Sequence, residues 1–265
     1  MNAQNTKNLL FNGFKKFIKE PDYQDNSNFL LFEKKNIFHE NIYKEMISQF
    51  PEYDFFNIDQ NIKKDENKHA FSSLDKNFNI FLDHSPIWKI FFELVNSQPF
   101  FNLVYNKYFS AKQSQNRFKK KWKTKKDSKF YDRFFRIPVE TRVHFSILRN
   151  GASISPHTDV PAKLFGMIFF LPSEDLKEIG NNGSTIFWKA VHKKSIWHNW
   201  ENEHLNDKQT KNFNKTHERF HISPFEKNKA IGFVKNAISW HSVDEFISSE
   251  NLQDRKSLNL FVRYV

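Results

Sequence analysis

Cysteine is absent from this 265-residue chain, and glycine and methionine are scarce, at 6 and 3 residues. The absence of cysteine excludes disulfides, thiolate metal ligands and cysteine nucleophiles. No apolar run approaches the roughly 18 residues that a transmembrane helix needs, and residues 1–8 lead into no signal-peptide pattern. A soluble, cytoplasmic protein is therefore the default expectation.

The composition fits a single globular domain. Hydrophobic residues make up 38% of the chain and aromatic residues 17%, and phenylalanine alone contributes 32 residues. A chain of this length and composition can bury a substantial core, which argues against wholesale disorder.

The formal charge of +11 raises the question of an acidic partner, because much of it is concentrated in one run. Residues 117–136 contain ten Lys or Arg against Asp127 and Asp132, a local net charge of +8. One interpretation is a groove for nucleic acid or another polyanion, with aromatic side chains that stack on bases. Aromatic residues of the run that could stack in this way are Trp122, Phe130, Tyr131, Phe134 and Phe135. The alternative, which we favour, is a solvated basic helix or loop.

Residues 1–136 are predicted to form a mainly helical region that packs on the rest of the chain. Apolar residues recur at helical spacing in 9–18 and in 42–50. Ser85-Pro86 is typical of a helix start, with an N-cap followed by proline at the first helical position. Another helix is expected to begin between Ser97 and Pro99, and we interpret the aromatic stripes of these helices as core.

Residues 137–265 are predicted to form a β core. Short strand-like segments with turn signals follow one another there without intervening helices, which favours an all-β sandwich or barrel. These segments cover 141–148, 164–171, 184–188, 230–234, 238–243 and 257–265. The turn Gly180-Asn181-Asn182-Gly183 suggests a hairpin just before the third of them. The expected fold class is therefore α+β with a mainly β core.

One stretch, residues 189–224, breaks this pattern. It is polar and lacks periodicity, so we expect a lid-like insertion. It carries five histidines, and His217 and His221 are four positions apart, which on a helix would place them on one face as a possible metal pair. Surface histidines in a lid are the alternative that we favour.

The segment Ser-Pro-His-Thr-Asp places His157 and Asp159 two positions apart. Pro156 and Pro161 favour an extended backbone there, on which this spacing puts both side chains on one face. The distant His241, at the end of a strand-like run, can complete a set of two imidazoles and one carboxylate. That set suits Fe(II) and leaves coordination positions open for other ligands, although zinc is also compatible.

Arg255 follows fourteen positions after His241 and opens the last predicted strand. One face of this strand is apolar, and the other begins with Arg255 and Ser257. If the polar face lines a pocket, the guanidinium and the hydroxyl can clamp a carboxylate. The alternative is a polar face in contact with solvent.

The order and spacing of these residues resemble the Fe(II)/2-oxoglutarate-dependent oxygenase superfamily, in particular its prolyl-hydroxylase-like and related branches. The residues that carry the resemblance are His157, Asp159, His241, Arg255 and Ser257. It covers about residues 141–264 and implies a double-stranded β-helix, or jelly-roll, catalytic core over 137–265 with N-terminal supporting helices. It also implies an enzyme that hydroxylates an organic substrate and releases succinate and CO₂.

The same resemblance implies roles for individual residues. Iron is expected to bind to His157, Asp159 and His241. The far carboxylate of 2-oxoglutarate is expected at Arg255 with Ser257 beside it, and O₂ is the further co-substrate. Possible substrate-pocket residues are Arg142, Lys163 and Trp240. Arg149 and Arg263 are further candidates for binding acidic groups. For each of the four charged residues, a structural salt bridge is nevertheless the favoured role. The expected partner is a small-molecule or peptide substrate, with no membrane.

Three features bear on alternatives. Collagen-type prolyl hydroxylases usually anchor the co-substrate with a lysine nearer the distal histidine, so Arg255 counts against a prolyl substrate. A nucleic-acid-directed oxidative demethylase would use the same metal site, but the paired arginines of that group are closer together than Arg255 and Arg263. A non-catalytic β-barrel binding protein is least favoured, because all three presumed ligands and the arginine are present.

Overall fold

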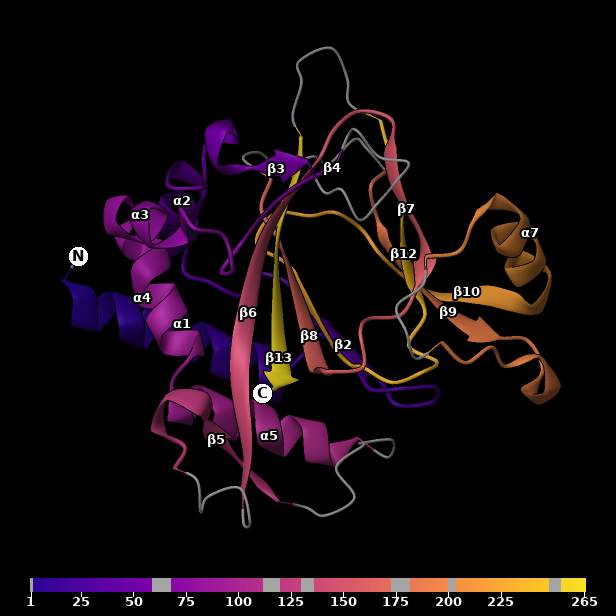
Figure 1. The fold of residues 1–265 in the computed structure, drawn as a ribbon, viewed down its shortest axis with the longest axis horizontal. Coiled ribbons are helices and arrows are strands. Elements are labelled where there is room, and N and C mark those ends of the chain that lie inside the picture. The colour runs from indigo at the N-terminus through magenta and orange to yellow at the C-terminus, as the bar shows by residue number, and fades with distance from the viewer. Residues whose placement is uncertain are drawn as a thin grey trace.

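A nine-stranded sheet, a four-stranded sheet and a layer of helices make up the computed structural model of this chain (Figure 1). The structure describes residues 2–58, 68–111, 120–129, 136–172, 182–199, 204–247 and 254–265. The N-terminal helices lie on the side of the larger sheet that faces away from the smaller sheet. Among the described residues, no helix is both long enough and apolar enough to cross a membrane.

Eight strands build the β core. Their bounds are β6 (Arg136–Leu148), β7 (Ala152–His157), β8 (Lys163–Phe170), β9 (Thr185–Ala190), β10 (His217–Ser223), β11 (Ala230–Val234), β12 (His241–Phe246) and β13 (Arg255–Tyr264). The larger sheet contains the order β11-β8-β13-β6 and the smaller sheet the order β10-β9-β12-β7. Successive strands thus alternate between the sheets, except for the neighbours β9 and β10. Eight antiparallel strands in this order form a jelly roll, so the predicted fold class is confirmed.

The helices predicted in the first half of the chain are present. They are α1 (Ala3–Lys19), α2 (Glu40–Ser48), α4 (Pro86–Val95) and α5 (Gln98–Ser110), and α3 (Phe78–His84) is a further helix that was not predicted from the sequence. Helix α4 begins with Pro86 at its first position, as the sequence predicts. Ser85 and Ser97 precede α4 and α5, although neither caps its helix through a side-chain hydrogen bond.

The same region contains short strands that the sequence did not reveal. They are β1 (Tyr23–Asp25), β2 (Leu31–Lys34), β3 (Asn57–Ile58), β4 (Lys68–Ser72) and β5 (Lys121–Thr124), with single 3₁₀ turns η1 (Tyr53–Phe55) and η2 (Lys125–Asp127). Strand β2 extends the larger sheet beyond β11, while β4 and β5 both pair with β6. Segments of two to five residues are too short to display a clear alternation of apolar and polar positions.

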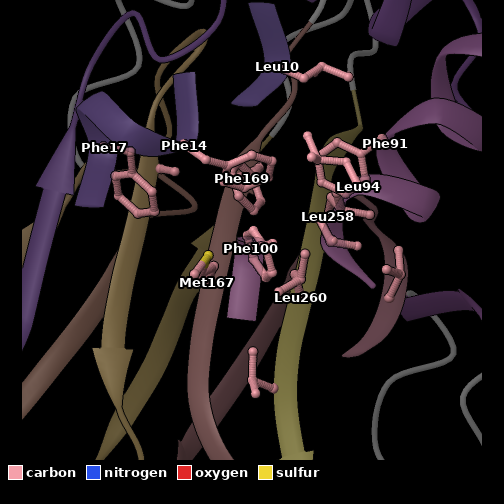
Figure 2. Packing of buried hydrophobic residues seen from close by; sticks show 14 of the residues in the cluster. Leu10, Phe14, Phe17, Phe91, Leu94, Phe100, Met167, Phe169, Leu258 and Leu260 are labelled. Atoms are coloured by element: carbon pink, nitrogen blue, oxygen red, sulfur yellow. The ribbon is translucent and has the colours of Figure 1, made fainter. Parts of the chain in front are cut away.

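The helices bury one face of the larger sheet. Phe14 of α1 packs against Phe91 of α4 and Phe169 of β8, with ring centroids 5.6 and 5.8 Å apart. Figure 2 shows Leu258 and Leu260 of β13 in the same cluster. Because side chains alternate along a strand, the polar residues of β13 point to the other face, toward the smaller sheet.

The segment 189–224 is not a uniform insertion. It contains the 3₁₀ turn η3 (Lys193–Ser195) and helix α7 (Asp207–Thr216), whose start is fixed by a capping box between Asn206 and Gln209. Its last part is β10, a strand of the smaller sheet. The less favoured alternative, with His217 and His221 on one helix face, is therefore wrong, because both lie on β10. The favoured surface position is wrong for His217, which is 4% exposed.

Two further predictions are wrong. The turn before β9 does not close a hairpin with β8, since β9 pairs with β10 and β12 in the other sheet. The second concerns the less favoured nucleic-acid interpretation: Trp122 is not available for stacking on bases, because it is 2% exposed and packs against Tyr105 and Tyr108. The other aromatic residues of the basic run lie outside the described residues.

Candidate metal centre

Strand pairing brings the two distant histidines together. His157 ends β7 and His241 begins β12, and the two are register partners across the smaller sheet. Asp159 lies two residues beyond His157, where the chain has left the strand. One ligand atom of each of these three side chains lies within 4.8 Å of the other two. The structure thus assembles the three residues that the sequence suggested as metal ligands.

Backbone carbonyls orient both imidazoles. The Nδ1 atom of His157 lies 2.9 Å from the carbonyl oxygen of Ser155, and Nδ1 of His241 lies 3.0 Å from that of Ser239. A carbonyl can only accept, so Nδ1 carries the hydrogen and Nε2 presents a lone pair, as in histidines that bind metals. Burial lowers the pKa of both rings, and the neighbouring imidazoles lower that of His157 further. Both histidines are therefore neutral at physiological pH, which is the form that binds a metal.

The carboxylate of Asp159 has an oxygen that is available to a metal. Oδ1 accepts from Nζ of Lys163 at 2.5 Å, whereas Oδ2 is buried and has no hydrogen-bond partner. Burial opposes ionisation, but the charge and the hydrogen bond of Lys163, together with the charge of Lys235, keep the pKa of Asp159 below its usual value. A buried carboxylate oxygen without a partner costs free energy, and a cation would relieve that cost. The donor set therefore fits a divalent metal ion.

Arg255 provides a second charged feature. It is 3% exposed, and its Nε and Nη2 atoms donate to the carbonyl oxygen of Gly183 at 2.6 Å and to Oγ1 of Thr185 at 3.1 Å. The rings of Phe170 and Phe225 lie 5.3 and 5.2 Å from the guanidinium carbon. Burial lowers the pKa of Arg255 to about 9, and no carboxylate of the described residues forms a salt bridge with it. The guanidinium is thus a buried positive charge that an anionic ligand can neutralise.

One pocket of about 550 Å³ contains the presumed ligands, Arg255 and Ser257. It lies between the two sheets, because its lining comes from β6, β8 and β13 on one side and from β7, β9 and β12 on the other. The charged residues that line it are Lys68, Arg142, Lys163, Arg255 and Arg263, against Asp159 as the single acid among the described lining residues. The pocket is thus strongly cationic around its metal-ligand group.

The suggested substrate-pocket residues separate into two groups. Arg142, Lys163 and Arg263 line the pocket. Trp240 does not, and its assignment is corrected. It is 2% exposed, and its Nε1 donates to the carbonyl oxygen of Trp197 at 2.8 Å in a separate apolar cluster. Arg149 also does not line the pocket, and its guanidinium lies over the ring of Tyr53 at 5.2 Å.

The structure adds His204 to the site. Its ring stacks on that of His157, with centroids 4.2 Å apart and an interplanar angle of 18°, and it lines the pocket. His204 is one of the five histidines in 189–224, and no spacing or neighbouring residue distinguishes it from the others. Its position depends on how the long connection between β9 and β10 packs against the pocket, and the local sequence does not encode that packing.

No protein-family profile matches the chain, and no curated protein matches it. Solved structures do show similarity. A prolyl-4-hydroxylase from Pseudomonas putida is 9% identical, with a TM-score of 0.45, over 95% of this chain and 99% of that one. An oxidoreductase of the 2OG-Fe(II) oxygenase family from Burkholderia pseudomallei is 8% identical, with a TM-score of 0.45, over 99% and 90%.

A third solved structure is the Fe(II)/α-ketoglutarate-dependent dioxygenase TqaL. It is 7% identical to this chain, with a TM-score of 0.48, over 99% of this chain and 89% of that one. Similarity of this size does not decide what a protein binds or which reaction it catalyses. The function proposed below is therefore based on the residues of the pocket.

Proposed function

We propose that this protein is an Fe(II)- and 2-oxoglutarate-dependent oxygenase. The observation that carries the proposal is one pocket that holds two neutral imidazoles, a carboxylate oxygen without a hydrogen-bond partner and a buried arginine without an acidic partner among the described residues. A divalent metal ion satisfies the first three groups. An anionic co-substrate that also reaches the metal satisfies the fourth.

Each residue has a defined task in this proposal. Nε2 of His157, Nε2 of His241 and the carboxylate of Asp159 bind Fe(II) and leave positions open for co-substrate and O₂. The guanidinium of Arg255 and the hydroxyl of Ser257 bind the far carboxylate of 2-oxoglutarate. Fe(II) and 2-oxoglutarate, when bound, would supply the activation of O₂, and succinate and CO₂ would be the co-products. The expected outcome is hydroxylation of a small-molecule or peptide substrate.

The surroundings of Arg255 favour this use. Phe170 and Phe225 flank its guanidinium and exclude water, and electrostatic attraction is stronger where water is excluded. Ser257 is 1% exposed and lies two residues further along the same face of β13, so its hydroxyl points into the same pocket. A carboxylate that binds here therefore meets a preformed charge-assisted site.

Succinate release from 2-oxoglutarate tests the proposal. We expect release that requires added iron and that falls in His241→Ala and Asp159→Ala by more than the roughly 10–100-fold typical of losses outside the ligand set. The exposed His192 provides a control, and His192→Ala should retain the activity. Circular dichroism should show that all three variants remain folded.

Two results would contradict the proposal. Succinate release that survives both ligand substitutions would remove the metal assignment. A protein that binds neither iron nor 2-oxoglutarate in calorimetric titrations would instead be a non-catalytic binding protein on the same fold.

A further inference from the structure

A second group of cations surrounds the end of β13 that is remote from Arg255, and it consists of Arg263 of β13, Lys163 of β8 and Arg142 of β6. Arg263 follows Arg255 by eight residues on the same face, which corresponds to about 27 Å along an antiparallel strand. It is the register partner of Glu140 on β6 and of Lys163 on β8. A five-carbon dicarboxylate that is anchored at Arg255 cannot reach this far. Arg263 is therefore available to a different ligand.

The acids near this group do not balance it. Glu140 accepts from Nε and Nη2 of Arg142 at 2.8 and 2.6 Å, and it also pairs with Lys125 at 3.2 Å. Its distance to Nε of Arg263 is 3.9 Å, so Arg263 receives only a weak share of the charge. Among the described residues, one carboxylate thus serves three cations, and Arg142 is the cation that it satisfies.

Lys163 is the cation nearest to the metal-ligand group. Its Nζ lies 2.5 Å from Oδ1 of Asp159 and 3.3 Å from the ring centroid of Phe261. A divalent ion at the His157–Asp159–His241 group would share the charge of Asp159. The ammonium of Lys163, whose side chain is 16% exposed, would then lack a full counter-charge, which favours the arrival of another anion.

We propose that the prime substrate carries an anionic group, a carboxylate or a phosphate, that binds between Lys163 and Arg263 beside Phe261. This inference rests on the proposed function, because it leaves the Arg255 end of the pocket to 2-oxoglutarate. The ring of Phe261 offers an apolar surface to the carbon skeleton of such a substrate. The pocket volume of about 550 Å³ suits a small acid rather than a nucleic-acid strand.

Sulfate serves as the probe, because it is a dianion with the shape of a phosphate ester and does not titrate near neutral pH. Calorimetry under argon would measure sulfate binding to the protein loaded with Mn(II) and 2-oxoglutarate. We expect saturable binding in the millimolar range that weakens by about tenfold or more in Lys163→Met and in Arg263→Met. The control Arg149→Met, which changes an arginine outside the pocket, should bind sulfate like the unaltered protein.

Competition then identifies the anion. Displacement of sulfate by acetate indicates a carboxylate, and displacement by methyl phosphate indicates a phosphate. Displacement by a short oligonucleotide at lower concentration than by either small acid would overturn the assignment to a small molecule. Loss of 2-oxoglutarate binding in Arg255→Met but not in Lys163→Met is the expected sign that the two ends of the pocket serve different ligands.

The loading steps keep the two proposals apart. Failure of Mn(II) or 2-oxoglutarate to bind would overturn the proposed function and this inference together. Normal loading without sulfate binding, or with equal sulfate binding in every variant, would overturn this inference and leave the proposed function intact.

Discussion

His241 of β12 stands opposite His157 of β7, and their ring centroids are 4.3 Å apart. A slip of one residue in this pairing would turn one imidazole to the opposite face of the sheet. The metal-ligand group therefore depends on the register of the smaller sheet, with only Asp159 supplied by the residues after a strand. A site built on paired strands is held more tightly than one built on loops.

Replacing Lys163 should strengthen metal binding. Its ammonium competes with a metal ion for Oδ1 of Asp159 and repels the ion through space. We expect Lys163→Met to bind Mn(II) several-fold more tightly, since a charge removed near a partly buried site changes affinity by about 1 kcal/mol. Calorimetric titration checks this, with Lys189→Met, at an exposed ion pair, as the control. Weaker binding would mean that Lys163 orients Asp159 instead of competing for it.

Replacing Arg255 should separate co-substrate affinity from stability. Arg255→Lys keeps the positive charge but removes the planar guanidinium that donates hydrogen bonds to Gly183 and Thr185. We therefore expect this variant to raise the KM for 2-oxoglutarate about tenfold, and Arg255→Met to raise it further. The buried charge has no acidic partner among the described residues, so Arg255→Met should not lower the melting temperature. A large loss of stability with an unchanged KM would indicate a purely structural arginine.

The β core was predictable because its long strands carry visible patterns. The apolar run 164–171 and the alternating faces of 257–265 correspond to β8 and β13. Which strands become neighbours was not predictable from local features, and the supposed hairpin before β9 shows why. A turn sequence indicates the local backbone conformation, whereas the order of strands in a jelly roll depends on which of the two sheets each strand joins. That order came only through the resemblance carried by the site residues.

The candidate site was predictable to the extent that its residues lie in extended segments with the correct alternation. Trp240 is an instructive error, because it is adjacent to His241 and neighbouring side chains in an extended segment point to opposite faces. The alternation itself could have excluded it. His204 could not have been found, because a residue in a long connection between strands reaches the site through tertiary packing alone.

Glu33 of β2 should make the stability of the protein depend on pH. Burial disfavours its charged form, but hydrogen bonds from His221 and Ser223 and the charge of Lys229 lower its pKa from 4.5 to about 2. A folded-state pKa below the unfolded value means that this stabilisation is complete above about pH 4.5 and is lost as the pH falls toward 2. The shift corresponds to roughly 3 kcal/mol as an upper bound.

Urea unfolding of Glu33→Gln checks this. At pH 7 we expect a loss of about 3 kcal/mol, because Lys229 is 1% exposed and would lose its nearer carboxylate. The difference from the unaltered protein should shrink as the pH approaches 2. Glu218→Gln, which breaks an exposed pair with Lys189, should cost less than about 1 kcal/mol at any pH. A pH-independent deficit in Glu33→Gln would assign the effect to packing.

Two glycines with positive φ allow a test of whether the position of Arg255 determines co-substrate affinity, because only one of them contacts Arg255. Gly151 and Gly183 have φ angles of 78° and 63°, so alanine at either position is strained by about 1–2 kcal/mol. At Gly151 an added Cβ would meet only a carboxylate oxygen at 4.0 Å, whereas at Gly183 it would lie 2.9 Å from the ring of Phe246 and 3.1 Å from Cδ of Arg255.

Both alanine variants should therefore lose stability, but only Gly183→Ala should weaken 2-oxoglutarate binding, because it displaces the guanidinium of Arg255. Thermal unfolding and calorimetric titration measure the two effects separately. If Gly183→Ala bound 2-oxoglutarate as tightly as Gly151→Ala does, the position of Arg255 would not determine co-substrate affinity. The carboxylate anchor would then have to be sought at another cation that lines the pocket, such as Lys163 or Arg263.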